Sequence, residues 1–173
     1  MSGQEEAMAL ARPLERRLDR AAALCASRGA QLTELRRQVL RLVLEAEQPV
    51  GAYAVLDRLK GLRAGAAPPT VYRALDFLLE QGLIHKVERL NAYVGCVEAG
   101  HDHAGEGHDH QHQFLICRRC GATAEISDSA VTAALAAAAA RAGFALDQIT
   151  VEAEGLCARC GQAGKAGVEA TLK

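Results

Sequence analysis

The N-terminal half of the chain repeats apolar residues with the period of an α-helix. Between residues 8 and 25 they recur at every fourth position, at Leu10, Leu14, Leu18 and Ala22, with charged residues between them. This spacing places the apolar side chains on one face of a helix. Three similar stretches follow, and they predict further helices between Thr33 and Pro49, over residues 52–62 and over residues 68–81.

A β-hairpin is predicted directly after the fourth helix. Residues 83–88 and 92–97 read as two strands joined by a short turn. We expect the register that sets His85 directly opposite Cys96, and directly opposed side chains lie close together. A slip of one residue would instead place these two side chains on opposite faces of the hairpin.

Helices in this order, followed by a hairpin, are typical of a winged helix-turn-helix domain, here residues 1–97. We expect Thr70, Tyr72 and Arg73 to be exposed at the start of the fourth helix. Free backbone N–H groups at a helix start bind phosphate, and an arginine can bind a guanine edge. The pattern therefore predicts a DNA-binding surface, although an ordinary solvated helix start would show the same residues, and other small helical domains share the helix order.

The C-terminal half combines strands with a helix, so the chain as a whole has an α+β composition. Strands are predicted at residues 114–117, 122–126 and 144–156. Asp128 or Ser129 can cap a helix that ends at Arg141. Residues 113–173 then form a small α/β domain. It is too thin to bury its apolar faces alone, and we expect it to be the dimerisation domain of a symmetric homodimer.

Two cysteine pairs bracket this C-terminal domain. Cys117 and Cys120 form one Cys-x-x-Cys turn, Cys157 and Cys160 form another, and a glycine follows each turn. Four thiolates at this spacing suit one tetrahedral zinc ion, and four protein ligands leave no open position for a substrate. We therefore predict a structural zinc that closes the domain. The alternatives are two disulfides or a thioredoxin-like redox pair.

Composition narrows the class of protein without deciding it. Half of the 173 residues are apolar, and no continuous apolar run approaches the length of a membrane span. The first residues lack the features of a signal peptide, so we expect a cytoplasmic protein. The formal net charge of −1 gives little support for a nucleic-acid partner.

All histidines occur at or after residue 85, and five of them lie in one polar segment. Residues 98–112 read as a His-rich hinge between the two domains, with candidate metal ligands at His101, His103, His108, His110 and His112. The first three of these histidines would also fit a solvated linker. His110 and His112 are better candidates, because they directly precede a predicted strand.

From about residue 15 to residue 162 the chain resembles the ferric-uptake-regulator family, specifically its zinc-uptake-regulator branch. The resemblance is carried by Pro69-Thr-Val-Tyr-Arg-Ala-Leu-Asp-Phe-Leu, by Gly82-Leu-Ile-His-Lys-Val-Glu and by the two Cys-x-x-Cys turns. It implies a dimeric, metal-dependent DNA-binding repressor and not an enzyme. By motif, Tyr72 and Arg73 resemble the residues of the family's recognition helix that approach bases, and Tyr53 resembles the tyrosine that opens the preceding helix.

The resemblance also implies two zinc ions per subunit. The structural ion would be bound by Cys117, Cys120, Cys157 and Cys160. The regulatory ion would be bound by His85, Cys96, His110 and Glu125, with His112 as a substitute for His110. A set with one thiolate suits zinc better than ferrous iron.

The sequence therefore predicts a zinc-responsive repressor that binds palindromic double-stranded operator DNA as a homodimer and controls zinc-uptake genes. A family member that senses iron or nickel is the nearest alternative. A zinc metallochaperone or zinc enzyme, with Glu125 as general base, is a more distant one.

Overall fold

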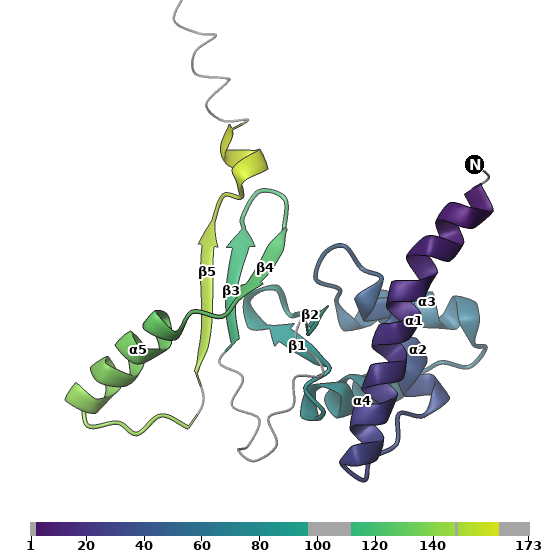
Figure 1. The fold of residues 1–173 in the computed structure, drawn as a ribbon, viewed down its shortest axis with the longest axis horizontal. Helices are drawn as coiled ribbons and strands as arrows, with labels where there is room; N and C mark the ends of the chain where they lie inside the picture. The colour runs from purple at the N-terminus through teal and green to yellow at the C-terminus, as the bar shows by residue number, and fades with distance from the viewer. Residues whose placement is uncertain (1–2, 97–111, 148, 163–173) are drawn as a thin grey trace, which may run out of the picture. The chain divides into compact units, whose positions relative to one another are not determined.

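The computed structural model describes residues 3–96, 112–147 and 149–162. The chain divides into two compact units, Met1–Gly105 and Glu106–Lys173 (Figure 1). The predicted hinge, residues 98–112, lies outside the described residues except for His112. Among the described residues, no helix is both long enough and apolar enough to span a bilayer.

The first unit contains the four predicted helices and the predicted hairpin. Its elements are α1 (Gly3–Ser27), α2 (Glu34–Leu44), α3 (Ala52–Leu62), α4 (Pro68–Glu80), β1 (Ile84–Val87), the short 3₁₀ helix η1 (Glu88–Leu90) and β2 (Ala92–Gly95). Figure 1 shows α1 as a long helix, and it packs against α2. Helix α1 begins earlier than the apolar repeat predicted.

One apolar core joins the helices of this unit. Leu18 of α1, Val39 of α2 and Leu75 of α4 are completely buried. In α4, Val71, Leu75 and Leu78 are buried, whereas Leu79 is only half-buried. Ala74 and Phe77 are buried in its place, and the Arg36 guanidinium carbon lies 3.5 Å from the centre of the Phe77 ring.

Ion pairs connect α1 to α2 beside this core. Arg37 of α2 is 2.7 Å from an Asp19 carboxylate oxygen and 3.0 Å from a Glu15 carboxylate oxygen. Arg41 forms a further ion pair with Glu15 at 2.6 Å. Partly exposed ion pairs contribute little stability individually. Together with the buried Leu18, however, they set the position of α1 along α2.

The hairpin has a different register from the one that the sequence predicted. His85 pairs with Val94, and Ile84 pairs with Gly95, so Cys96 lies beyond the last pair. The reason is that Glu88 leaves the strand to begin η1, which Asn91 closes with a left-handed φ of 45°. Because the register differs by two residues and not by one, the faces of the strands are unchanged.

The second unit is a three-stranded sheet with one helix. The central strand β3 (His112–Cys117) pairs antiparallel with β4 (Thr123–Ile126) and parallel with β5 (Thr150–Gly155). Helix α5 (Ser129–Arg141) connects β4 to β5, and the Asp128 side chain caps it by accepting a 2.8 Å hydrogen bond from the Ala130 N–H. The last strand is shorter than predicted, since β5 extends only along the six residues of β3.

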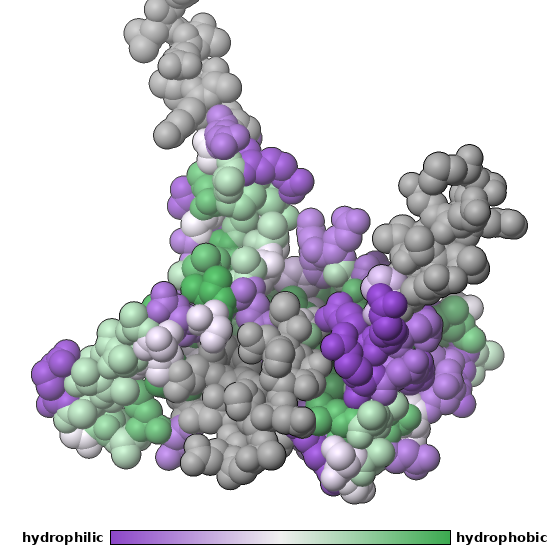
Figure 2. Space-filling model, in the orientation of Figure 1, coloured by the Kyte–Doolittle hydropathy of each residue, from purple (hydrophilic) through white to green (hydrophobic). Residues whose placement is uncertain are grey.

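Helix α5 buries none of its residues within the chain. Figure 2 shows apolar surface over this helix. Leu135 of α5 is 40% exposed, and Phe144 and Leu146, which follow it, are 70% and 44% exposed. The second unit therefore presents apolar side chains that it does not cover itself.

Candidate zinc sites and nucleic-acid interface

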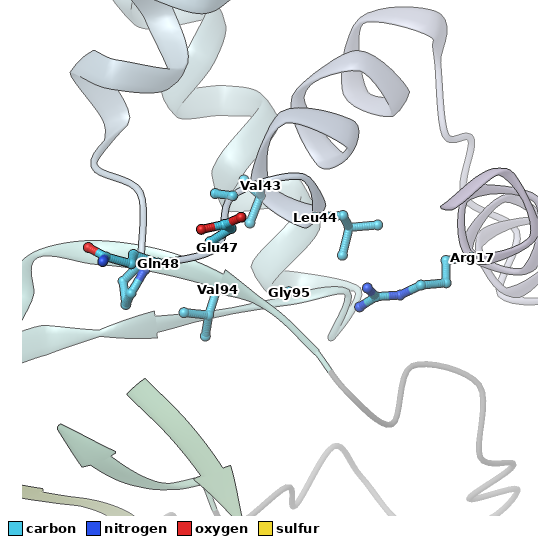
Figure 3. A pocket seen from close by; sticks show the side chains of 9 residues that line it. Arg17, Val43, Leu44, Glu47, Gln48, Val94 and Gly95 are labelled. Atoms are coloured by element: carbon cyan, nitrogen blue, oxygen red, sulfur yellow. The ribbon is translucent and has the colours of Figure 1, made fainter. Parts of the chain in front are cut away.

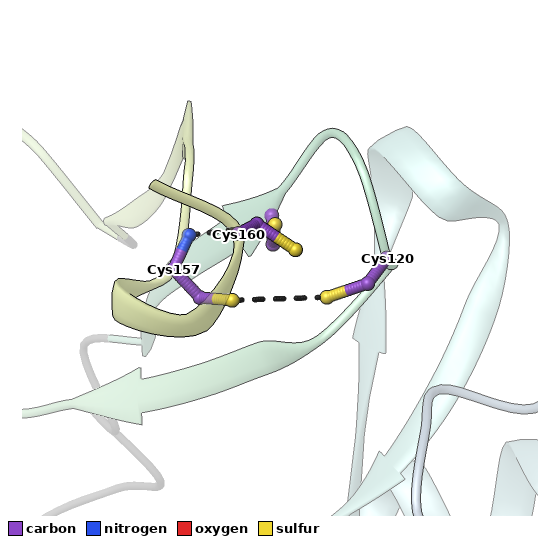
Figure 4. Close-up of side chains that lie close together, drawn as sticks. Cys120, Cys157 and Cys160 are labelled. Carbon is purple, nitrogen blue, oxygen red and sulfur yellow. Dashed lines mark hydrogen bonds between the residues drawn. The ribbon is translucent and has the colours of Figure 1, made fainter. Parts of the chain in front are cut away.

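The four cysteines of the two Cys-x-x-Cys turns come together at one end of the sheet. Cys117 ends β3, Cys120 follows in the same turn, and Cys157 and Cys160 lie in the turn after β5 (Figure 4). Their four sulfur atoms all lie within 4.8 Å of one another. The sequence prediction that these residues form one cluster is confirmed.

Two similar backbone turns aim the sulfurs at this point. The Gly121 N–H donates to the Cys117 carbonyl, and the Gly161 N–H donates to the Cys157 carbonyl, each at 2.8 Å. Gly121 has a φ of +72°, which favours glycine. The pairing of β3 with β5 then sets the two turns side by side.

The sulfur separations fit a zinc ion and not a disulfide. The Sγ atoms of Cys120 and Cys157 are 3.8 Å apart. A tetrahedron with Zn–S bonds of about 2.3 Å has S···S edges of about 3.8 Å, whereas a disulfide bond is about 2.05 Å long. None of the chain's six cysteines, all of which are described, forms a disulfide. The donor set therefore fits a structural zinc and argues against the disulfide alternative.

The surroundings of the cluster shift the pKa values of its cysteines in different directions. The backbone N–H of Cys157, 3.4 Å from the Cys117 sulfur, and further backbone N–H groups lower the pKa of Cys117 to about 6. The side chain of Cys120 and burial raise the pKa of Cys160. Four neighbouring thiolates repel one another, so a divalent cation is needed to stabilise all of them in the ionised form.

A second pair of candidate ligands lies in the hairpin of the first unit. His85 and Cys96 are each only 4% exposed. A ring nitrogen of His85 and the Cys96 sulfur lie within 4.8 Å of one another. The two residues are not directly opposite, but Val94 and Cys96 lie on the same face of the strand, and this brings Cys96 next to His85.

The remaining predicted ligands are in the second unit or outside the described residues. Glu125 lies on β4, is half-buried and pairs with Phe114 of β3. His112 is the first residue of β3. His110 lies outside the described residues, as do His101, His103 and His108.

The predicted DNA-binding residues lie at the starts of α3 and α4. Tyr53, in the first turn of α3, is 69% exposed, and Tyr72 in α4 is 40% exposed. Arg73 is exposed and Thr70 is half-buried. Helix α4 begins with Pro68 and Pro69, which lack the N–H groups that a helix start leaves unused. An exposed tyrosine and arginine on this helix form a surface suited to nucleic acid.

Comparison with known proteins identifies the family. Residues 27–154 match the Ferric uptake regulator family. The chain belongs to this family. It is 45% identical over 143 residues to the "Zinc uptake regulation protein" of Escherichia coli (strain K12), an alignment that covers 83% of this chain and 80% of that protein.

Two solved structures of zinc uptake regulators have the same fold. One is described as "Zinc Uptake Regulator Complexed With Zinc AND DNA". It is 41% identical, with a TM-score of 0.80, and the match covers 88% of this chain and 97% of that one. The structure of holo XcZur is also 41% identical, with a TM-score of 0.74, and that match covers 84% of this chain and 96% of the other. The Fur-family chain described here is thus of the zinc uptake regulator branch.

Two arginines next to the candidate sites of this Fur-family chain were not found from the sequence. The Arg17 guanidinium donates to the Cys96 carbonyl at 3.3 Å, across 79 residues of sequence. The Arg119 guanidinium donates to the Cys160 carbonyl, also at 3.3 Å. A signal existed for Arg119, since it lies inside a Cys-x-x-Cys turn. No sequence pattern pointed to Arg17.

Proposed function

We propose that this protein is a zinc-responsive transcriptional repressor. It binds operator DNA as a dimer in the cytoplasm when zinc occupies a regulatory site, and it controls zinc-uptake genes. One observation carries this proposal. A buried imidazole and a buried thiol have their ligand atoms within 4.8 Å of one another, in the hairpin that directly follows the exposed helix α4.

The regulatory ion takes four donors in this proposal. His85 and Cys96 come from the hairpin of the first unit, and Glu125 comes from β4 of the second unit. The fourth is the hinge residue His110, for which His112 is the substitute. One thiolate, two imidazoles and a carboxylate suit tetrahedral zinc, whereas ferrous iron prefers more nitrogen and oxygen donors.

The division of these donors between two units provides the regulation. When bound, zinc would connect the predicted DNA-binding domain, residues 1–97, to the predicted dimerisation domain, residues 113–173. Residues 98–112 act as the hinge between them. Zinc binding favours one arrangement of the two units only if zinc binds more tightly to that arrangement than to the others. That arrangement is the one competent to bind DNA.

Dimerisation occurs through the second unit. Helix α5 has no buried residues, and Phe144 is 70% exposed. The unit also has an apolar hollow of about 360 Å³, and Leu115, Ala124, Ala153 and Leu156 are among its lining residues. A second copy of the chain covers this apolar surface in a two-fold arrangement, the commonest symmetry of soluble oligomers.

Each subunit then presents α4 to one major groove of a palindromic operator. Tyr72 and Arg73 contact base edges. Thr70, near the start of α4, contacts the DNA backbone, and Tyr53 contacts the DNA from α3. Arginine is suited to guanine because its guanidinium donates two parallel hydrogen bonds to the O6 and N7 atoms.

The test is a DNA-binding titration at fixed salt with buffered free zinc. The parent protein should bind a palindromic operator only as zinc rises, and parallel arms with iron and manganese should not reproduce this. Cys96→Ser should lose the zinc response while keeping its structural zinc, and Cys25→Ser, at a core cysteine, serves as the matched control. Metal-independent binding by the parent, or an unchanged zinc response in Cys96→Ser, would contradict the proposal.

A further inference from the structure

One side chain of helix α1 reaches the pair of proposed regulatory ligands, His85 and Cys96. Figure 3 shows the Arg17 side chain extending from α1 toward the end of β2, beside Gly95. Its Nη2 atom donates to the Cys96 carbonyl oxygen at 3.3 Å, and the side chain is half-buried. A charged donor forms a stronger hydrogen bond to a carbonyl than a neutral one does.

Cys96 is thereby fixed on both sides of its α-carbon. Its own N–H donates to the Leu83 carbonyl at 3.1 Å, which continues the hairpin one residue past the last strand pair. Its carbonyl accepts from Arg17. Because Leu83 is two residues before His85, the bond to Leu83 fixes the position of Cys96 relative to His85. The bond from Arg17 fixes the position of Cys96 relative to α1.

The helix that carries Arg17 is itself fixed in position. Leu18 is completely buried, and Glu15 and Asp19 on either side of Arg17 pair with arginines of α2. The end of β2 is also closely packed, because a Cβ atom placed on Gly95 would overlap the Leu44 side chain and lie 3.4 Å from the Arg17 guanidinium. Arg17 is the one described residue of α1 that lines a cavity of about 190 Å³, whose other lining residues belong to the end of α2, the segment that follows it and β2.

We propose that Arg17 is a positioning residue for the Cys96 thiolate: it holds the end of β2 so that Cys96 is in place for the regulatory ion before the ion binds. This inference rests on the proposed function, in which Cys96 is a ligand. Arg17 does not touch the ion. It acts through the backbone of its ligand, and residues in this role commonly change metal affinity about ten- to a hundred-fold when they are replaced.

The test compares full-length proteins that retain their structural zinc. Arg17→Met keeps the apolar stem but removes the donor, Arg17→Lys keeps a charged donor, and Arg20→Met replaces an exposed arginine of the same helix. Zinc affinity at the regulatory site is measured by competition with a chelator. Cobalt added to the same site reports the sulfur bond through its thiolate-to-cobalt absorption band.

Arg17→Met should bind zinc about ten-fold more weakly than the parent, with a weaker cobalt–thiolate band. Arg17→Lys should recover part of both losses, and Arg20→Met should match the parent. Thermal unfolding without regulatory metal separates this effect from a general loss of stability. Should Arg17→Met fail to fold, the affinity and spectrum of Arg17→Lys decide, because a shorter donor should still give values between those of Cys96→Ser and the parent.

Cys96→Ser distinguishes the two possible failures. If Cys96→Ser loses regulatory zinc but both Arg17 variants bind zinc and cobalt like the parent, the role of Arg17 is wrong and the regulatory site stands. If Cys96→Ser binds zinc like the parent, the ligand assignment fails, and the role of Arg17 fails with it.

Discussion

The Arg28 guanidinium donates a hydrogen bond of 2.7 Å to the carbonyl oxygen of Gln81. Arg28 follows the end of α1, and Gln81 is the C-cap of α4. The last carbonyl groups of a helix have no partners within the helix, and a cationic side chain near them is favourable. The first helix thus holds the end of the helix that we propose enters the DNA groove.

Arg28→Met should loosen this end of α4. The bond is exposed, so we expect a loss of less than about 1 kcal/mol in the free energy of unfolding. Hydrogen exchange of the Gln81 and Leu83 amides should increase more than that of amides in α3. Arg20→Met is the matched control, and equal exchange in the two variants would show that the contact has no effect.

Gly82 should tolerate no side chain without cost. It has a φ of +65°, and its N–H donates to the Leu79 carbonyl while the Leu83 N–H donates to the Leu78 carbonyl, the two bonds of a Schellman motif. Gly82→Ala should lower the free energy of unfolding by about 1 kcal/mol. Gly61→Ala, inside α3 with open space around it, should instead stabilise by about 0.5–1 kcal/mol. Denaturant titration measures both changes in the free energy of unfolding. If Gly82→Ala stabilised the protein, the assignment of Gly82 to the left-handed position of the Schellman motif would be wrong.

Cys120→Ala should remove one zinc ion per subunit and unfold the second unit, because three thiolates bind the structural ion less tightly and folding depends on that ion. Zinc content and circular dichroism measure this result. Cys25 is completely buried in the first unit, where burial raises the pKa of its thiol. Cys25→Ala should therefore keep the full zinc content. A full complement of zinc in Cys120→Ala would contradict the four-cysteine site.

Arg73→Ala should weaken operator binding without changing stability, because the side chain is exposed. The expected loss is about 1–3 kcal/mol if Arg73 binds a base, and discrimination between operator variants should decrease with it. Arg20→Ala, at an exposed position of α1, should bind DNA like the parent. A uniform loss across all operator variants would instead assign Arg73 to a phosphate.

The first unit should lose stability in acid through Glu15. Hydrogen bonds from Arg41 and Arg37 lower the pKa of this carboxyl below 4.5. A group with a lowered pKa in the folded state stabilises the fold above its unfolded pKa, and this contribution disappears as the pH falls through the folded value. Glu15→Gln should therefore flatten the loss of stability below about pH 4.5, measured by thermal unfolding across pH. A loss of stability in acid that is as steep in Glu15→Gln as in the parent would contradict this role.

The helices and the cysteine cluster could be predicted because their signals are local. Helix α3 lies over residues 52–62 as predicted, with Val55, Leu56 and Leu59 buried, and the spacing of each cysteine pair sets its own turn. The membership of the family and the zinc uptake regulator branch were also recognised from short motifs.

The errors arise where a distant or unusual backbone feature decides the structure. The hairpin register depends on where Glu88 leaves the strand and on the left-handed Asn91, neither of which an apolar pattern records. The start of β5 depends on the length of β3. The contact from Arg17 to Cys96 joins residues 79 positions apart, so no local pattern contains it.

The pairing of β3 with β5 has a consequence for the synthesis of the protein. Cys117 and Cys157 are 40 residues apart, and parallel strands must close such a loop before they gain any contact. We expect the zinc ion to hold this loop closed, so that folding of the second unit follows metal loading. A chain made during zinc shortage would then remain open to proteases. Zinc would thus control both the amount of repressor in the cell and the affinity of the repressor for DNA.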